Sequence, residues 1–337
     1  PLDLAAETMN TRTRNGFSLI ELMIAMTLGL VLAAGLITIF VNNRHSFNRD
    51  EAILTMQDDA RQAIRELVND LTMAGLWADL VLPASIVPDT SLIVGTDCGP
   101  VAAAGWIYRA MIPGTGQAES LSTVDNATVV SANASFSCLG AEIVPGTDIV
   151  AIKRVAGARA PLVLTDDTVY LRTNGTVGML FQEPADVPPA VPVPAPFSTW
   201  EYRPSIYYVR NFATTAGDGI PTLCRKVLEF GPLPNMVTEC LAQGVEDLQL
   251  EFGLDTNDDG DPNVYLPNPT PAQMQTAVSA RIYVLARSAR PDIRYTNEKS
   301  YSISNAPVYE PDDNFYRRVF SIVVGLHNLK ALRNLGG

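Results

Sequence analysis

The chain has 337 residues, of which 47% are hydrophobic, and this is long enough to bury a sizeable core in one or two domains. Its formal net charge of -12, with 36 acidic against 24 basic residues, argues against nucleic-acid binding, because phosphate contacts need clustered Lys and Arg side chains. The 23 glycines and 24 prolines favour a loop-rich β fold over a helical bundle, so we expect an α+β protein.

The first predicted element is an apolar run over residues 17–41, with the sequence FSLIELMIAMTLGLVLAAGLITIFV. About 20 apolar residues are sufficient to cross a bilayer as a helix, so this run is predicted to be transmembrane. A secretory signal would have a shorter apolar core. Basic residues flank the run on both sides, and they therefore give little indication of its orientation in the membrane.

The run contains one ionisable residue, Glu21, whose carboxylate is costly to place in hydrocarbon without a partner. Residues 16–21, GFSLIE, resemble the leader junction of type IV prepilins and type II secretion pseudopilins. The resemblance implies that a prepilin peptidase cuts after Gly16 and methylates the new N-terminal residue, Phe17. It also implies that Glu21 pairs with the Phe17 amine of a neighbouring subunit, which would fix one axial register between subunits. The alternative is a plain membrane anchor that contains a stray Glu.

The residues on either side of the run complete the predicted N-terminal region. Residues 1–16 are leader and upstream residues that would be removed, with Met9 as the expected start of the leader. Over residues 42–76, apolar side chains recur at three- and four-residue spacing between charged ones such as Asp70, which predicts that the same helix continues and packs on a globular head. These apolar residues are Ile53, Met56, Ala60, Ile64, Leu67 and Leu71. Gly75 is the expected end of the helix.

Residues 77–337 are predicted to form a mainly antiparallel β head, because short β-rich runs alternate there with turn signals. The runs are residues 148–155, 168–171, 178–181, 205–209, 225–230, 245–252, 278–286 and 318–326. Alternation places Leu248, Leu250 and Phe252 on one face of their strand. We expect this strand to neighbour residues 278–286 in one sheet.

Four cysteines and a proline-rich stretch constrain the loops of the head. No CxxC pair or nearby His suggests zinc, and an exported head would favour disulfides. Of the three connectivities, we expect pairing of sequence neighbours, Cys98 with Cys138 and Cys224 with Cys240; four buried free thiols are the alternative. Residues 183–196 (EPADVPPAVPVPAP) are expected to form an extended surface loop, with a motif for a proline-binding partner as the alternative.

The sequence DTNDDGD over residues 255–261 has the alternating oxygen ligands and the glycine of the first half of a calcium loop. The expected ligands are Asp255, Asn257, Asp259 and Asp261. An EF-hand would need a bidentate Glu where this chain has Leu266, so the site would be of another kind, with a structural role for Ca²⁺. The alternative is a plain Asp/Asn/Gly turn between two strands. No cofactor is otherwise required.

Catalysis is not expected, because the sequence lacks the motifs that would support it. The two histidines, His45 and His327, lie outside any nucleophile elbow, HExxH motif or phosphate loop. We therefore predict that the protein is not an enzyme.

The head has its own resemblance. Its size, the segment LEFGLDTNDDGDPN (residues 250–263) and the following VSARIYVLARSARPD (residues 278–292) are similar to PilW-type minor pilins, which correspond to the J-type minor pseudopilins of type II secretion. This resemblance implies a type IV pilin-like fold, in which a long helix packs on a mainly antiparallel sheet. It also implies a protein that helps to prime assembly of a type IV pilus and lies at or near its tip.

The same resemblance implies partners and a location. The partners are the prepilin peptidase, other minor pilins, the major pilin, the inner-membrane assembly platform and a PilY-type tip adhesin. The protein would lie in the inner membrane with its head in the periplasm before assembly, and at the pilus tip on the cell surface afterwards. Two alternatives stay open: a J-type pseudopilin of a type II secretion system, and a membrane-anchored calcium-binding adhesin.

Overall fold

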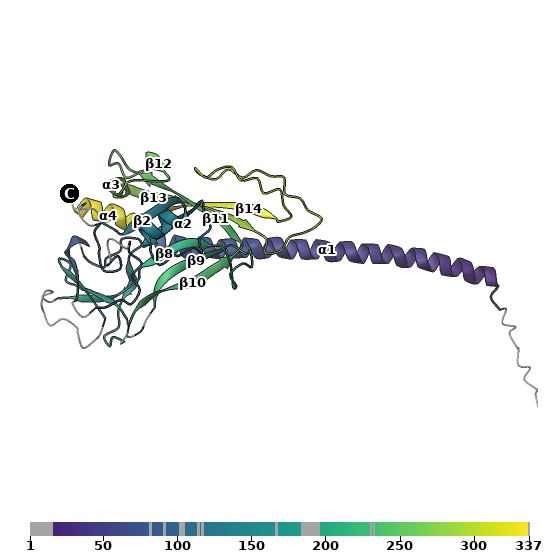
Figure 1. Cartoon of the computed structure of the whole chain (residues 1–337), viewed down its shortest axis with the longest axis horizontal. Coiled ribbons are helices and arrows are strands. Elements are labelled where there is room, and N and C mark those ends of the chain that lie inside the picture. Colours follow the sequence, from purple (N-terminus) through teal and green to yellow (C-terminus); the bar gives the residue numbers. More distant parts are fainter. Residues whose placement is uncertain are drawn as a thin grey trace, which may run out of the picture. The chain divides into compact units, whose positions relative to one another are not determined.

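The structure is a computed structural model, which describes residues 16–80, 83–89, 92–100, 105–112, 115, 118–165, 168–182, 196–229, 231 and 233–335. The chain forms two compact units that divide after Glu51. The predicted leader up to residue 15, and residues 183–195 of the proline-rich stretch, lie outside the described residues. A long apolar helix followed by a mainly antiparallel head confirms the α+β, pilin-like class (Figure 1).

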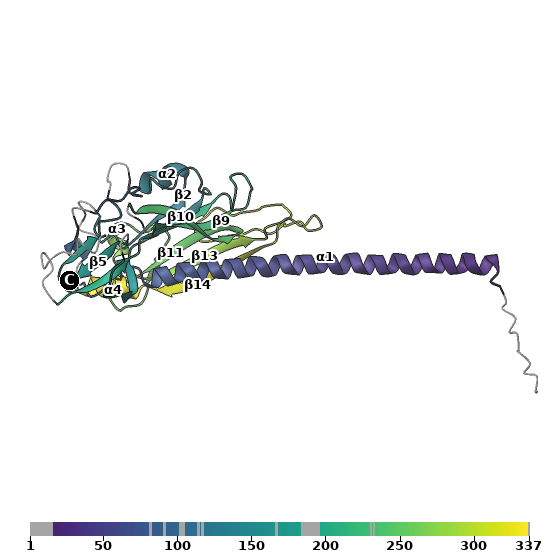
Figure 2. The ribbon, with the colours of Figure 1, turned by 90° about the horizontal axis from the view of Figure 1, so that it is seen from below.

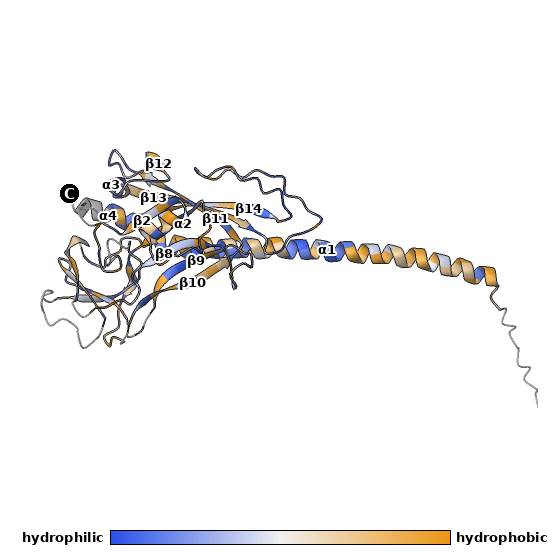
Figure 3. Cartoon of the chain, in the orientation of Figure 1, coloured by the Kyte–Doolittle hydropathy of each residue, from blue (hydrophilic) through white to orange (hydrophobic). Residues whose placement is uncertain are grey.

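The long helix, α1 (Leu19–Thr72), begins two residues after Phe17 and includes both the apolar run and most of the amphipathic stretch. Figure 3 shows the change from a hydrophobic first half to a mixed second half. Within the described chain, α1 is the one helix long and apolar enough to cross a membrane. Its Thr27 and Thr38 hydroxyls donate to the carbonyls of Ile24 and Ala34, at 2.9 and 2.8 Å, so these polar groups are satisfied inside the helix.

The second half of α1 supplies an apolar stripe to the core of the head. The buried residues of this stripe are Met56, Ala60, Ala63, Ile64, Leu67 and Leu71. The helix ends at Thr72, before the expected stop at Gly75. Gly75 adopts φ 76°, which suits glycine, and its N–H donates to the carbonyl of Lys153 at 3.1 Å. The backbone therefore leaves the helix by bonding to the head.

The head contains three sheets, and the strands of each are named in their spatial order. The first sheet is β12 (Val264–Leu266), β11 (Val245–Leu254), β13 (Ala277–Arg287) and β14 (Arg317–Gly325). The second is β10 (Asn235–Gln243), β9 (Thr222–Glu229), β8 (Ser205–Arg210), β3 (Thr147–Ile152) and β2 (Leu121–Ala127). The third is β1 (Ile86–Pro88), β6 (Gly178–Phe181), β5 (Tyr170–Thr173), β7 (Ser198–Tyr202) and β4 (Val155–Arg159). Of these strand pairs, β1 with β6 is parallel and the others are antiparallel. The short helices are η1 (Pro83–Ser85), α2 (Val129–Ser135), α3 (Pro271–Met274) and α4 (His327–Leu335).

The second sheet separates two hydrophobic cores. Along β3, Val150 and Ile152 belong to the core that contains α1, whereas Ile149 and Ala151 belong to the core around Trp77 and Trp106. Every residue of β3 is buried, which explains its continuous apolar sequence. Figure 2 shows the head half of α1 beside the first and second sheets.

The predicted strand runs all contain strands, and two differences are informative. Residues 148–155 contain the end of one strand and the start of another, because the chain changes sheets at Lys153 and Arg154. Strands β1, β2, β7, β10 and β12 were missed; they are short or carry many polar residues, so alternation is weak in them. The expected pairing of residues 245–252 with 278–286 is confirmed, with Leu250 opposite Ile282.

Candidate functional site

The predicted processing and docking residues lie at the start of α1. Glu21 is in the first turn, and its carboxylate Oε2 accepts the backbone N–H of Ser18 at 2.9 Å. Ser18 is the residue just before the helix, and Glu21 lies three residues after it. A Glu at this position caps the N-terminus of the helix by accepting the N–H of the preceding residue, and its negative charge interacts favourably with the helix dipole. Glu21 therefore has a local partner in the isolated chain. This capping role was not predicted, although Ser-x-x-Glu is its signature.

Gly16 is not required by the fold of the chain. A Cβ atom built there would meet no other atom within 4 Å, and its φ is not in the left-handed region. The same holds for Gly29 inside the apolar run. The fold of the chain therefore gives no reason for glycine at residue 16, and cleavage after this residue stays a prediction.

The first unit exposes a continuous apolar surface. Every side chain from Gly16 to Arg44 is exposed, and Phe17 reaches 91% exposure. The apolar residues lie on all sides of the helix and leave no polar face toward water. Such a surface is stable in lipid or among other apolar helices, so this segment can anchor the chain and can pack against other subunits.

In the head, α1 also contributes a buried carboxylate, that of Asp70, which is 4% exposed. The sequence pattern had placed this residue on the polar, solvent-facing side of the helix. Its Oδ1 accepts from the Arg154 guanidinium, and its Oδ2 accepts from the hydroxyls of Tyr207 at 2.6 Å and Ser205 at 3.1 Å. Burial and the neighbouring Asp70 carboxylate raise the pKa of Tyr207 far above its ordinary value, so Tyr207 stays a donor. These bonds fasten α1 to β8 and to the connection between β3 and β4.

Beside Asp70 lies an open cavity of about 390 Å³ between α1 and the strands. Its charged lining is mixed and internally paired: Arg225 contacts Glu239 at 2.9 Å and Glu66 at 3.5 Å, and Arg203 contacts Glu201 at 2.8 Å. With its charges neutralised by one another, the cavity offers no array of one sign for a charged ligand. Its contacts are those of a helix-to-sheet junction.

A second ionic cluster, also missed from the sequence, lies in the other core. The Lys153 ammonium is fully buried and donates to the Glu119 carboxylate at 2.7 Å and to the Arg109 carbonyl at 2.8 Å. Its Nζ lies 4.5 Å from the ring centre of Trp106. Burial lowers the pKa of Lys153 to about 8, against the opposing effect of Glu119. The Arg109 guanidinium also donates to Glu119, so these groups hold one another in the core.

The predicted calcium loop lies between β11 and β12, and its side chains bond within the loop. The buried Asp255 accepts the N–H of Gly260 at 3.0 Å, while Asp259 accepts from the Asn257 side chain and from the N–H of Asp261, both at 2.9 Å. Asn257, Asp259 and Asp261 are exposed.

Within the described residues, no group of three or more acidic, His or Cys side chains is placed to hold a metal ion. The Lys330 ammonium lies 3.4 Å from the Gly260 carbonyl and brings a positive charge to the loop. This arrangement is that of an Asp-rich turn, and calcium binding stays a prediction.

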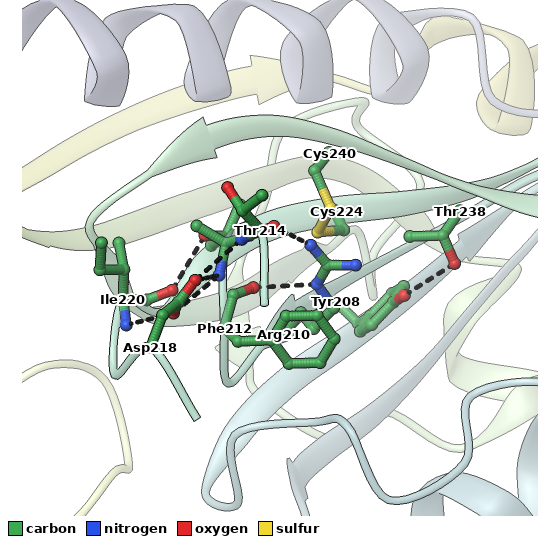
Figure 4. The surroundings of a disulfide bond; sticks show 11 residues. Tyr208, Arg210, Phe212, Thr214, Asp218, Ile220, Cys224, Thr238 and Cys240 are labelled. Atoms are coloured by element: carbon green, nitrogen blue, oxygen red, sulfur yellow. Dashed lines mark hydrogen bonds between the residues drawn. A yellow bond between two sulfur atoms is a disulfide. The ribbon is translucent and has the colours of Figure 1, made fainter. Parts of the chain in front are cut away.

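Both disulfides have the pairing expected from the sequence, Cys98 with Cys138 and Cys224 with Cys240. Cys224 on β9 is buried, whereas Cys240 on the edge strand β10 is exposed. Figure 4 shows the second bond beside the β8–β9 turn, where the carboxylate of Asp218 accepts several backbone N–H groups. These hydrogen bonds lower the pKa of Asp218. The disulfide and the turn together fix the edge of the second sheet.

Comparison with known families agrees with this geometry. Residues 206–328 match the model of type IV pilus-assembly protein W, and residues 11–37 match the prokaryotic N-terminal methylation motif. Taken together, the two matches fit a PilW-type minor pilin. The first spans β8 to the start of α4, and the second includes Gly16, Phe17 and Glu21. No curated protein and no solved structure matches the chain.

The two matches give the protein its general role. They support a minor pilin related to the type IV pilus, and the matched families contain structural assembly proteins and not enzymes. The methylation motif implies processing by a prepilin peptidase and interaction with other pilus components. Together with the apolar helix, it fits anchoring in the membrane and display on the pilus surface.

Proposed function

We propose that the protein helps to prime assembly of a type IV pilus and lies at or near its tip. The observation that carries the proposal is the apolar first unit, which begins with a methylation motif and whose apolar side chains are exposed. Such a helix needs lipid or other apolar helices around it. The membrane supplies the lipid before assembly, and a filament of pilin subunits supplies the helices afterwards.

Processing prepares the helix for assembly. Hydrolysis of the peptide bond between Gly16 and Phe17 frees the Phe17 amine, which the same peptidase methylates. The freed amine is a cation that lies four residues before Glu21 in the chain. Each processed subunit therefore presents one positive and one negative group at the same end of its helix.

Docking would exchange one partner of Glu21 for another. In the isolated chain the carboxylate accepts the N–H of Ser18. In the filament, we propose that it pairs with the Phe17 amine of a neighbouring subunit, in surroundings where an unpaired charge is costly. A subunit shifted along the axis would leave both charges unpaired, so the pair favours one register. The proposed partners are the other minor pilins, the major pilin, the inner-membrane assembly platform and a PilY-type tip adhesin.

The proposal is tested by intact mass and N-terminal fragmentation of the protein extracted from its native membrane. The expected mature chain starts at N-methylated Phe17. A chain that retains Gly16 would contradict the processing step and favour a plain membrane anchor.

Tip location is tested by immunogold labelling of filaments, with label expected at one end; label along the whole length would contradict it. Co-purification with secretion components in place of pilus components would favour the J-type alternative.

A further inference from the structure

Strand β14 is a long free edge of the first sheet. It pairs with β13 over nine residues, from Arg317 to Gly325, and it is the last strand in the sheet order (Figure 2). Within the part of the chain that the structure describes, the backbone groups of β14 bond only to β13. The other side of the strand therefore presents N–H and C=O groups that a further strand could bond.

The side chains along this edge are apolar on both faces of the sheet. The register places Val319 and Val323 opposite Leu285 and Arg281, and it places Ile322 opposite Ile282 on the face toward α1. Val319, Ile322 and Val323 are 36%, 40% and 55% exposed. The edge thus combines unused hydrogen-bonding groups with apolar side chains that lie where a neighbouring strand would cover them.

The usual protection of an exposed edge is missing from the middle of β14. Residues 319–325, VFSIVVG, contain no charge and no proline. Such a segment on an open edge promotes pairing with another chain, and soluble proteins interrupt it with Lys, Pro or a bulge. The long β13–β14 connection packs through Tyr301 and Ile303 on Leu285 of β13, and it leaves Ile322 and Val323 of the strand 40% and 55% exposed.

The direction of β14 limits what can pair with it. Phe320 packs on the cluster of Met56 and Ala60, whereas Val324 belongs to the core that contains Leu67 and Leu71, so β14 runs along the head half of α1 in the same direction. Antiparallel pairing of two copies would point these helix segments in opposite directions. Subunits that enter a filament from one membrane share one orientation, which excludes that pairing.

Charge identifies the occupant further. Arg318 is exposed at the start of the edge. Its guanidinium lies 5.5 Å from the ring centre of Phe320, and it forms no ion pair with a described carboxylate. We propose that β14 binds a β-strand from the head of a different pilin subunit, apolar along its length and acidic opposite Arg318. This inference rests on the proposed function, because it needs a filament in which heads of different subunits lie side by side.

The test uses the full chain in its native host, with a photo-crosslinking amino acid in place of Val323. The matched control carries it at Val130, an apolar residue of α2 that is 80% exposed and belongs to no sheet edge. The Val323 probe is expected to crosslink to a strand of a different protein that carries an N-terminal methylation motif, identified by peptide mass spectrometry. The Val130 probe is expected not to reach that strand.

Two further variants test the contacts themselves. In the chain that carries the probe at residue 323, Val319→Lys and Arg318→Glu are each expected to lower recovery of the crosslinked partner by about tenfold, with Val130→Lys as the control that leaves it unchanged. Melting temperatures close to that of the unmodified chain would show that the variants fold.

A crosslink from Val323 to a second copy, or none at all from a processed chain, would overturn the edge assignment. The N-terminal peptide in the same sample reports processing, so an unprocessed chain would contradict the proposed function separately.

Discussion

The backbone N–H of Ser18 donates to the carboxylate of Glu21 at 2.9 Å, so the charge in the apolar run also caps the helix that carries it. Capping needs an acceptor oxygen, whereas pairing with an amine of another subunit needs a negative charge. The two roles can therefore be separated by substitutions that keep one and remove the other.

Glu21→Gln keeps an acceptor for Ser18 and removes the charge. We expect normal cleavage after Gly16 and about tenfold less of the variant in sheared filaments, because an unpaired Phe17 amine would remain in the apolar core. Glu51→Gln, an exposed position on the same helix, is the control. Quantitative immunoblotting of filament and membrane fractions checks the result. Normal recovery of Glu21→Gln would leave capping as the role of Glu21.

Gly16→Leu is expected to leave uncut precursor in the membrane. The chain itself has open space around this residue, so the substitution should not disturb the fold, and the loss would reflect the peptidase site. Gly29→Leu is the matched control, because a Cβ atom there also meets no atom within 4 Å. The measurement is the mass of the N-terminal peptide. Cleavage of Gly16→Leu at the normal rate would refute the assigned leader junction.

Asp70→Ala should destabilise the head by about 3–5 kcal/mol, because it leaves the largely buried Arg154 guanidinium, 12% exposed, without its carboxylate. Asp70→Asn keeps acceptor capacity and should cost less. Asp58→Ala removes a carboxylate that is 78% exposed and should change stability by no more than about 0.5 kcal/mol. Chemical denaturation of the purified full chain measures all three. Equal effects at residues 58 and 70 would show that the buried contacts do not fasten the helix.

Asp148 should make stability depend on pH. Burial raises its pKa from 3.8 to about 8, and the backbone N–H bonds from Asn126 and Leu250 only partly oppose this. Because the folded pKa exceeds the unfolded one, stability from this group is complete below about pH 4 and is lost as pH rises toward 8. Relative to the chain with Asp148, Asp148→Asn should therefore gain stability between about pH 4.5 and pH 7.5, by up to ~1.4 kcal/mol per pH unit. A difference that stays constant with pH would refute the raised pKa.

Calcium binding at residues 255–261 predicts that Ca²⁺ raises the melting temperature and that chelator removes the gain. Asp259→Ala should then lower the melting temperature more with Ca²⁺ than with chelator. Asp255→Ala also removes the bond to the Gly260 N–H, so some loss is expected in both conditions. Equal shifts in both conditions for the two variants would identify the loop as a plain turn.

Several parts of the fold were predictable because the signal lies in neighbouring residues. Alternation identified Leu250 and Phe252 as core residues of β11, and both are fully buried. Helical spacing identified Met56 to Leu71 as the packed stripe of α1. Asp70 was placed wrongly on the polar side, because charge at helical spacing normally marks the solvated face. Lys153 was missed for the same reason, since one Lys after an apolar strand resembles its exposed end.

The apolar helix, the strand periodicity and the family resemblance could be predicted because each depends on residues that are adjacent or regularly spaced in the chain, and the leader junction after Gly16 stays a prediction of the same kind. Which charges are buried and which edge is free depends on contacts between residues far apart in the chain. Asp70 is tolerated inside because its partners Arg154, Ser205 and Tyr207 come from segments far along the chain. Likewise, β14 is an open edge because no other described strand pairs beside it, and a strand's own sequence carries no record of its place in the sheet.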